Sequence, residues 1–233
     1  MKLAIQYARD GAAKYISHLD MQRAFARAIR RADIDAQYSQ GFNPHIVMSF
    51  ASPLSVGYAT QADYLEVGVQ EGVRPGAAMD ALNAALPRDI RVRDAFFLPE
   101  GGKKLMAMNH SADWRLTFTL ENERKCDTIN HAVKVLGNSE TYFTPDRKGR
   151  EVDIAPLVLR LDDMGNGCVE ARLQNSSMGA LNPAVLANAL LREAGLEAGW
   201  EVCRMECYAL ANGEVLPFSA LREERAETAE AAK

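Results

Sequence analysis

The sequence lacks the features of membrane and secreted proteins. None of its apolar runs approaches the roughly 18 residues that a membrane-spanning helix needs. The chain begins with alternating polar and apolar residues and shows no secretory signal segment. We therefore expect a cytoplasmic protein with no membrane partner.

The sequence also lacks the common catalytic and cofactor motifs. It contains no phosphate-binding loop, no dinucleotide fingerprint, no His-Glu-x-x-His zinc motif and no Gly-x-Ser-x-Gly nucleophile elbow. An iron–sulfur radical enzyme needs the spacing Cys-x-x-x-Cys-x-x-Cys. Cys203 and Cys207 have the first interval, but Leu210 occupies the third position. We expect no metal or other cofactor in this chain, and we interpret all four cysteines as structural thiols.

The composition is that of a globular protein. Hydrophobic residues make up 48% of the chain and charged residues 25%, which supports a buried core and excludes wholesale disorder. The net charge of −4 excludes a surface that is basic throughout but leaves room for a local basic patch. A length of 233 residues accommodates two domains of about 100 residues each.

Two halves of the chain share one pattern of strands and helices. Apolar periodicity in the first half predicts, in order, residues 2–8 (strand), 17–32 (helix), 46–50 and 63–69 (strands), 75–86 (helix) and 90–98 (strand). In the second half it predicts 114–120 (strand), 125–136 (helix), 157–161 and 168–173 (strands), a helix opened by Pro183, and 200–210 (strand).

The order β-α-β-β-α-β therefore occurs twice, as in a ferredoxin-like unit. The predicted fold is α+β, with tandem ferredoxin-like units at residues 1–99 and 113–218. A polar linker is expected at residues 100–112. The charged tail at 219–233 is expected to be frayed or disordered.

The first predicted helix has two distinct faces. Ser17 is a good N-cap and Asp20 completes a capping box. Apolar residues form one side of the helix, and the other side carries Arg23, Arg27, Arg30 and Arg31. Such a face is either a solvated surface or a site for phosphate or carboxylate, because arginine favours bidentate contacts with oxyanions.

The loop after this helix, residues 39–45, concentrates residues suited to binding. Its candidate binding residues are Gln40, Phe42, Asn43 and His45. His45 and His18, together with Tyr15 and Lys14, are also weak candidates for proton transfer if the fold brings them together. The ordinary alternative for both histidines is a structural hydrogen bond.

A second polar cluster lies at residues 146–156. It contains Arg147, Lys148, Arg150 and Asp153 and is punctuated by glycine. The cluster is either an exposed loop of mixed charge or a rim that binds anions together with the helix arginines.

Four segments resemble one known family. They are Lys14-Tyr15-Ile16-Ser17-His18-Leu19-Asp20, Tyr38-Ser39-Gln40-Gly41-Phe42-Asn43-Pro44-His45, Ser49-Phe50-Ala51-Ser52-Pro53-Leu54 and Gly149-Arg150-Glu151-Val152-Asp153-Ile154-Ala155-Pro156. In these segments the chain resembles the bacterial radical SAM-associated (radical SAM-linked) domain of unknown function. Ala155 departs from the basic residue expected there. The resemblance implies an accessory or substrate-binding protein, linked to RNA, that acts in trans with a radical SAM enzyme.

Three functions stay open at this point. The first is an RNA-binding accessory protein that uses Lys14, Arg23, Arg27, Arg30, Gln40, Phe42, Asn43, His45, Lys148, Arg150 and Asp153. The second is an RNA-processing or RNA-modifying enzyme that uses His18 and His45 with Tyr15. The third is a protein-interaction adaptor, in which the second half of the chain would cover the basic helix.

Overall fold

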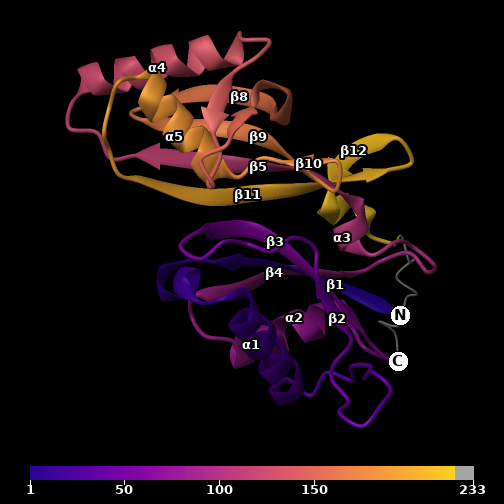
Figure 1. Ribbon diagram of the computed structural model, residues 1–233. Coiled ribbons are helices and arrows are strands. Elements are labelled where there is room, and N and C mark those ends of the chain that lie inside the picture. The colour runs from indigo at the N-terminus through magenta and orange to yellow at the C-terminus, as the bar shows by residue number, and fades with distance from the viewer. Residues whose placement is uncertain (224–233) are drawn as a thin grey trace, which may run out of the picture.

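The computed structural model describes residues 1–223, which form two halves stacked one on the other (Figure 1). The first half contains β1 (Lys2–Arg9), a short 3₁₀ turn η1 (Gly11–Tyr15), α1 (His18–Arg31), β2 (Met48–Phe50), β3 (Ala59–Gly68), α2 (Pro75–Ala85) and β4 (Ile90–Phe97). All four predicted strands and both predicted helices of this half are present.

The second half has the same main elements with several additions. It contains α3 (Leu105–Met108), β5 (Asn109–Phe118), α4 (Glu123–Gly137), β6 (Phe143–Pro145), β7 (Glu151–Asp153), η2 (Ala155–Leu157), β8 (Val158–Gly165), β9 (Cys168–Ser176), β10 (Gly179–Ala180), α5 (Pro183–Glu193), β11 (Trp200–Ala211), β12 (Glu214–Pro217) and η3 (Phe218–Leu221). The predicted α+β class is confirmed.

One large mixed sheet runs through both halves. Its order is β10-β9-β5-β11-β3-β1-β4, with β2 on β3, β8 on β9 and β12 on β11. The strand order is β4-β1-β3-β2 within the first half and β11-β5-β9-β8 within the second. The halves join where β11 pairs in parallel with β3, at Cys203 with Ala59 and Arg204 with Thr60. The first sheet region is therefore continued directly into the second.

The four longer helices lie on the outer sides of the stack, and the short helix α3 lies at the junction of the halves (Figure 1). In Figure 1, α1 and α2 lie below the first half's strands, and α4 and α5 lie above those of the second. The face of β1 and β3 that carries Leu3, Ile5 and Leu65 packs with the α1 and α2 core. The opposite face, with Ala4 and Tyr64, belongs to the core of the second half.

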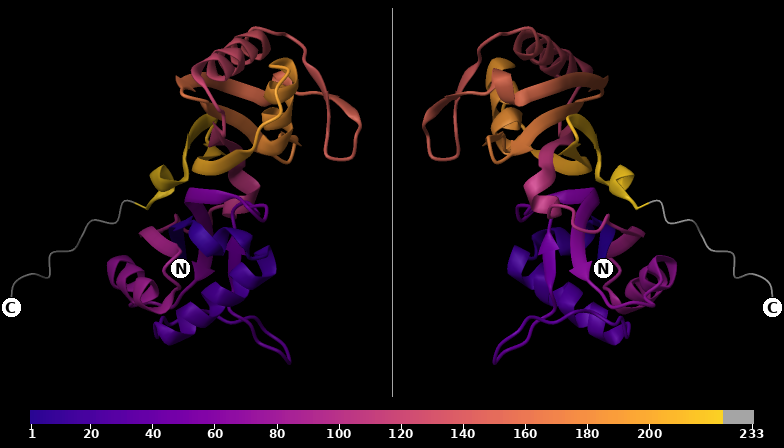
Figure 2. Two further views of the ribbon diagram at one scale, coloured as in Figure 1. Left: turned by 90° about the vertical axis from the view of Figure 1, so that its left-hand side faces the viewer. Right: turned by 90° about the vertical axis from the view of Figure 1, so that its right-hand side faces the viewer.

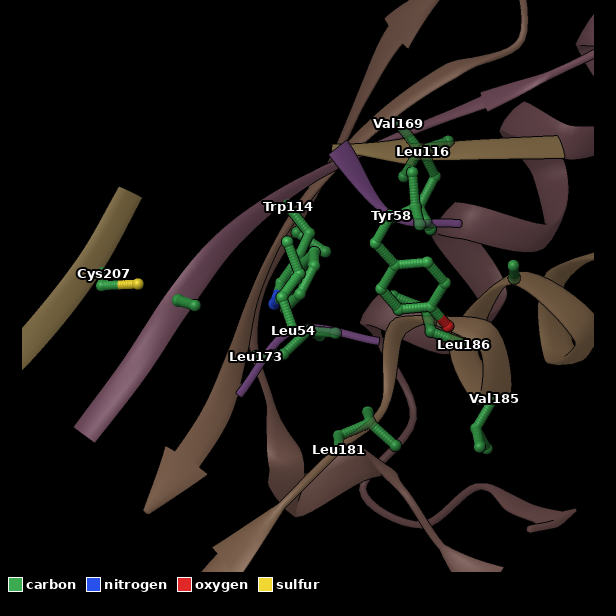
Figure 3. Packing of buried hydrophobic residues seen from close by; sticks show 14 of the residues in the cluster. Leu54, Tyr58, Trp114, Leu116, Val169, Leu173, Leu181, Val185, Leu186 and Cys207 are labelled. Atoms are coloured by element: carbon green, nitrogen blue, oxygen red, sulfur yellow. The ribbon is translucent and has the colours of Figure 1, made fainter. Parts of the chain in front are cut away.

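Burial on both faces explains why β3 does not alternate polar and apolar residues. From Ala62 to Gly68 every residue of this strand is buried. Figure 3 shows Leu54 and Tyr58 of the first half packed among Trp114 and other residues of the second. The two halves share a core as well as a sheet.

The segment expected to be a polar linker is partly built into this shared core. β5 begins at Asn109, and Leu105, Ser111 and Ala112 are buried. The backbone N–H of Leu105 donates to the Glu66 carboxylate at 3.1 Å. The segment was expected to be polar because of its Gly-Gly-Lys-Lys run, which ends just before this contact.

Phe218, the last residue before the expected tail, and Arg222 within that tail both pack on the first half. Phe218 is fully buried against Tyr64, with ring centroids 5.3 Å apart. Arg222 donates to Asp94 at 2.6 Å. The rest of the predicted tail, residues 224–233, lies outside the described residues. In the described part of the chain, no helix is both long and apolar enough to cross a membrane.

Candidate functional site

The exposed face of α1 is the first candidate surface. Ser17 caps the helix by accepting from the backbone N–H of Asp20 at 3.1 Å, as predicted. The residues of the opposite face that are buried are Met21, Phe25, Ala28 and Ile29. Their burial fixes the rotation of the helix, so that Arg23, Arg27 and Arg30 all face solvent.

The α1 arginines differ in their partners. Arg23 donates to Asp20 at 3.0 Å, and hydrogen bonds from Ser17 and Arg23 lower the pKa of that carboxyl. Within residues 1–223, Arg27 and Arg30 form no hydrogen bond or ion pair with another side chain. These two guanidinium groups are therefore free to bind an anion. We call Arg23, Arg27 and Arg30 the α1 arginine face.

The loop at residues 39–45 is closed at its base by His45. Oγ of Ser39 lies 2.8 Å from Nδ1 of His45 and accepts from the His45 backbone N–H at 3.1 Å. The backbone N–H of Ser39 donates to the His45 carbonyl at 2.8 Å. Gly41, with φ of +120°, bends the tip of the loop.

This closure leaves the other candidate residues of the loop in solvent. Gln40 and Asn43 are exposed, and the Phe42 ring is 106% exposed. Figure 2 shows the loop as the purple hairpin that projects from the lower part of the molecule. A fully exposed aromatic ring on a projecting loop is accessible for stacking on a partner.

The structure does not bring the two candidate histidines together. The His18 ring lies edge-on to Phe50 at 5.1 Å, and its Nε2 is 3.2 Å from the Gln22 amide nitrogen. His45 bonds to Ser39 instead. Phe50 and His45 are five residues apart along a largely extended segment, which corresponds to roughly 16 Å at ~3.3 Å per residue. Their separate partners support structural roles for both rings.

Lys14 and Tyr15 lie at the junction of the two halves. Nζ of Lys14 forms an ion pair with Glu201 at 3.1 Å, and this hydrogen bond raises the lysine pKa. The same nitrogen lies 5.5 Å from the centre of the Tyr15 ring, which is 64% exposed. An open hollow of about 420 Å³ adjoins this ion pair. Lys14 links the halves and is not a free cation of the α1 arginine face.

The second polar cluster forms the hairpin β6–β7, shaped by two carboxylates. Asp146 accepts from the backbone N–H groups of Lys148 and Arg150 at 2.7 and 3.0 Å, and from the Arg150 guanidinium at 2.6 Å. These Arg150 contacts, with that of Lys148, lower the pKa of Asp146 to about 2. The Arg150 guanidinium is thus paired, whereas the Arg147 and Lys148 side chains are exposed.

The carboxylate of Asp153, a predicted binding residue, is hydrogen-bonded to the backbone of its own hairpin. Its Oδ1 accepts from the backbone N–H of Tyr142 at 2.8 Å and from that of Ala155 at 3.1 Å. The carboxylate therefore fixes the base of the β6–β7 hairpin and the turn that follows it.

The two basic groups lie on different halves. The α1 arginine face belongs to the first half, and the β6–β7 hairpin projects from the second (Figure 2). Within residues 1–223 no hydrogen bond or ion pair joins the two groups. They are separate anion-attracting surfaces in this structure.

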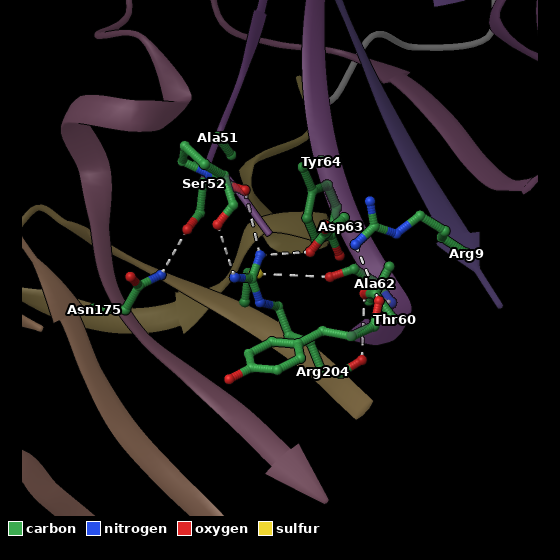
Figure 4. Close-up of polar contacts among 12 residues, drawn as sticks. Arg9, Ala51, Ser52, Thr60, Ala62, Asp63, Tyr64, Asn175 and Arg204 are labelled. Carbon is green, nitrogen blue, oxygen red and sulfur yellow. Dashed lines mark hydrogen bonds and ion pairs between the residues drawn. The ribbon is translucent and has the colours of Figure 1, made fainter. Parts of the chain in front are cut away.

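A buried ionic cluster between the halves was missed by sequence reasoning (Figure 4). Nη1 of Arg204 on β11 donates to Asp63 on β3 at 2.6 Å, and its guanidinium also reaches the backbone carbonyls of Ser52 and Pro53 at 3.4 Å. Arg9 donates to the carbonyl of Tyr58 at 3.0 Å. A charged residue inside an apolar strand was the available signal.

The described part of the chain contains side chains of the metal-ligand types, thiols among them. No group of three His, Cys, Asp or Glu side chains lies close enough to hold an ion there. The four cysteines are free thiols, and burial raises the pKa of Cys207 to about 12. A thiol held in that state is a poor ligand and nucleophile.

The fold defines a mixed α+β protein in which the two halves of the chain share one large sheet. Residues 2–183 match the family described as an uncharacterized protein conserved in bacteria (DUF2344), and the chain belongs to this family. The matched region includes α1, the 39–45 loop and the β6–β7 hairpin. No curated protein matches the chain.

Proposed function

We propose that this protein is a non-catalytic RNA-binding accessory protein that works in trans with a radical SAM enzyme. The observation that carries the RNA part is the α1 arginine face. Three arginines stand on one solvent-facing side of a well-packed helix, and two of them lack a protein partner among the described residues. The protein as a whole has a net charge of −4, so this face is a local positively charged surface that attracts phosphates.

The 39–45 loop supports the proposal that the bound RNA is single-stranded. Contacts with phosphates bind a strand whatever its base sequence, whereas aromatic rings stack on unpaired bases. Phe42 stands free at the loop tip with Gln40 and Asn43 beside it. This arrangement favours single-stranded RNA over a regular duplex.

The radical SAM partnership rests on the resemblance of the four segments quoted above. The family match spans all four segments, from Lys14 to Pro156. The protein would hold substrate RNA, and the partner would supply the iron–sulfur chemistry. We place this work in the cytoplasm, because free thiols persist in that compartment.

The two other functions have less support. The enzyme hypothesis needs His18 and His45 in one pocket, and each ring has a separate partner. The adaptor hypothesis needs the second half to cover the basic helix, and the α1 arginine face is exposed.

We further propose that each half is a ferredoxin-like unit. The order β4-β1-β3-β2 and the order β11-β5-β9-β8 are the same when each half is numbered from its own first strand. This equality supports an origin of the two halves as a tandem repeat of one βαββαβ unit.

The proposal is tested by RNA binding of a matched pair of variants. One variant carries Arg23→Ala, Arg27→Ala and Arg30→Ala on α1. The control carries Arg88→Ala, Arg91→Ala and Arg93→Ala, which removes the same charge from other exposed positions of the same half. The wild type and the control should bind bacterial tRNA and rRNA fragments, and the α1 variant should lose most of that affinity. Equal RNA affinity of the two variants would contradict the proposal.

A further inference from the structure

A hollow at the junction of the halves combines polar groups from both of them. It has a volume of about 190 Å³, and its lining includes Pro53, Ser55 and Tyr58 from the first half with Asn175 and Asn182 from the second. We call it the junction cleft. Its volume is below the usual range of drug-sized ligand pockets, so it suits one planar ring system better than a large ligand.

The cleft wall is built around one hydrogen bond between the halves. Tyr58 donates from its hydroxyl to Oδ1 of Asn182 at 2.8 Å. The same oxygen accepts from the backbone N–H of Ala184 at 2.9 Å, because Asn182 caps α5. This oxygen thus already accepts two hydrogen bonds. The amide nitrogen of Asn182 has no partner among the described residues.

Asn175 presents the complementary group. Its amide nitrogen donates to Ser52 at 3.1 Å, a contact drawn in Figure 4. Its Oδ1 accepts from no other described residue. The cleft therefore offers one free amide donor and one free amide acceptor, which is the pairing that reads the edge of a nucleobase.

Two buried donors in the lining of the cleft also lack partners. Nε1 of Trp114 and Nε of Arg204 form no hydrogen bond in the described part of the chain. These side chains are only 4% and 3% exposed, and the Arg204 guanidinium lies 4.6 Å from the centre of the Trp114 ring. Both nitrogens are closed off from solvent, so a ligand in the cleft would contact the more exposed amides of Asn175 and Asn182 instead.

A second hollow adjoins the cleft on the side of the β6–β7 hairpin. It has a volume of about 290 Å³ and shares Ala180, Leu181 and Asn182 with the junction cleft. Arg147, Lys148 and Arg150 stand on its rim. The positive charges of these side chains could bind a phosphate group of a ligand whose ring occupies the junction cleft.

An electrostatic effect connects the hairpin with the cleft. Burial raises the pKa of Tyr58, and the positive charge of Arg147 opposes that rise. Arg147 is thus close enough to the cleft wall for its charge to be felt there. Asn182 and the hairpin cations Arg147 and Lys148 line one and the same hollow.

We propose that the junction cleft binds a single nucleotide, with its base against Tyr58, Asn175 and Asn182 and its phosphate on Arg147 and Lys148. This inference rests on the proposed RNA binding and deepens it. The nucleotide is an unpaired one in the bound strand, because a paired base does not expose its edge to such a cleft. The α1 arginine face holds the strand elsewhere, and the cleft selects the nucleotide.

The test uses the full-length protein and a fluorescent single-stranded RNA of about ten random-sequence nucleotides. Asn182→Ser keeps a capping oxygen for α5 and removes the free amide donor. This change should weaken binding about tenfold, and Arg147→Ala should weaken it several-fold. The matched control Arg124→Ala, an exposed charge on α4, should stay within about twofold of the wild type. Unfolding midpoints verify that each variant is folded.

Competition with the four nucleoside monophosphates separates the two possible sources of a nucleotide. A monophosphate should displace the strand only at a much higher concentration, and this displacement should vanish in Asn182→Ser. A monophosphate that binds as tightly as the strand would overturn the assignment to RNA and leave a free-nucleotide site.

Failure of this inference is distinguishable from failure of the proposed function. If Asn182→Ser and Arg147→Ala bind RNA like the wild type while the α1 variant does not, the cleft assignment is wrong and RNA binding stands. If the folded wild type binds no RNA, both proposals fall.

Discussion

Arg204 and Asp63 form a buried ion pair that joins the two halves. Nη1 of Arg204 lies 2.6 Å from Oδ1 of Asp63, and the side chains are 3% and 2% exposed. The pair lies where β11 and β3 meet in parallel, next to the bridge between Arg204 and Thr60. The contact therefore sets the register of the two halves and holds the 52–53 backbone beside the junction cleft.

The first prediction concerns this pair. Asp63→Leu or Arg204→Met alone leaves one buried charge without its counter-ion, which should lower the free energy of unfolding by about 3–5 kcal/mol. Urea unfolding measures the change. Arg115→Ala breaks the more exposed pair with Glu170 and should cost no more than about 1 kcal/mol.

The double variant Asp63→Leu with Arg204→Met adds a sharper comparison. It removes both charges, so much of the stability lost in the single variants should return. A single variant as stable as the wild type would show that the pair does not hold the halves together.

The second prediction concerns the pH dependence of stability. Burial raises the pKa of Glu206, although the Cys207 backbone N–H and the Tyr64 hydroxyl donate to it at 2.8 Å. A folded-state pKa above the unfolded value means that the contribution of Glu206 to stability is greatest in acid. It falls as the pH rises through the unfolded value of about 4.3 toward the folded value.

Glu206→Gln keeps the accepting oxygen and removes this titration. The stability of the variant relative to the wild type should therefore increase from pH 4 upward and level off above the folded pKa. Urea midpoints at several pH values measure the difference, and Glu197→Gln at an exposed position is the control. A difference that does not change with pH would contradict the assignment.

The third prediction separates a structural from a binding role for Asp153. Asp153→Ala removes the acceptor of two backbone N–H groups and should destabilise the β6–β7 hairpin by roughly 1–3 kcal/mol. Asp153→Asn keeps an oxygen there and should recover most of this loss. Hydrogen exchange measures how far the backbone amides of Tyr142 and Ala155 lose their protection. Unchanged protection in Asp153→Ala would restore the binding hypothesis.

The fourth prediction concerns Phe42. Because the ring makes no packing contribution at 106% exposure, Phe42→Ala should leave the unfolding midpoint unchanged. Loss of one stacked base should lower affinity for single-stranded RNA by about 1–3 kcal/mol. Phe143→Ala, another exposed ring, is the control. If Phe42→Ala and Phe143→Ala bind RNA equally well, the loop tip does not stack on bases.

Much of the helical structure could be predicted from local signals. Residues 17–32 and 125–136 were expected as helices, and α1 and α4 span His18–Arg31 and Glu123–Gly137. Capping residues and 3.6-residue periodicity are local, so the prediction needs no knowledge of the fold. The turn Gly165-Asn166-Gly167 between β8 and β9, with three positive φ values, carries a local signal of the same kind.

Strand ends were less predictable because a distant partner determines them. β3 begins at Ala59, four residues before the predicted start, since β11 pairs there from 144 residues away. β12 follows a turn at Asn212-Gly213, a hairpin signal that was overlooked. β2 is shorter than the predicted 46–50, with Ile46 contributing only an isolated bridge to Tyr38.

The candidate site was predicted only in part. The exposure of the arginine face follows from helix periodicity, and the structure agrees. The partners of Lys14 and Asp153 could not be read from the chain, because Glu201 lies 187 residues away and the Asp153 contacts depend on hairpin geometry. The cleft around Tyr58 and Asn182 exists only through contacts between the halves.

The most direct test of the central claim is the salt dependence of RNA binding. The slope of log K against log salt reports the number of phosphates neutralised, at about 0.7 per contact on a single strand. For the variant lacking Arg23, Arg27 and Arg30, the account predicts a slope shallower than that of the wild type by about two, while the Arg88, Arg91 and Arg93 control keeps the wild-type slope. Identical slopes in all three proteins would contradict the claim that α1 binds RNA.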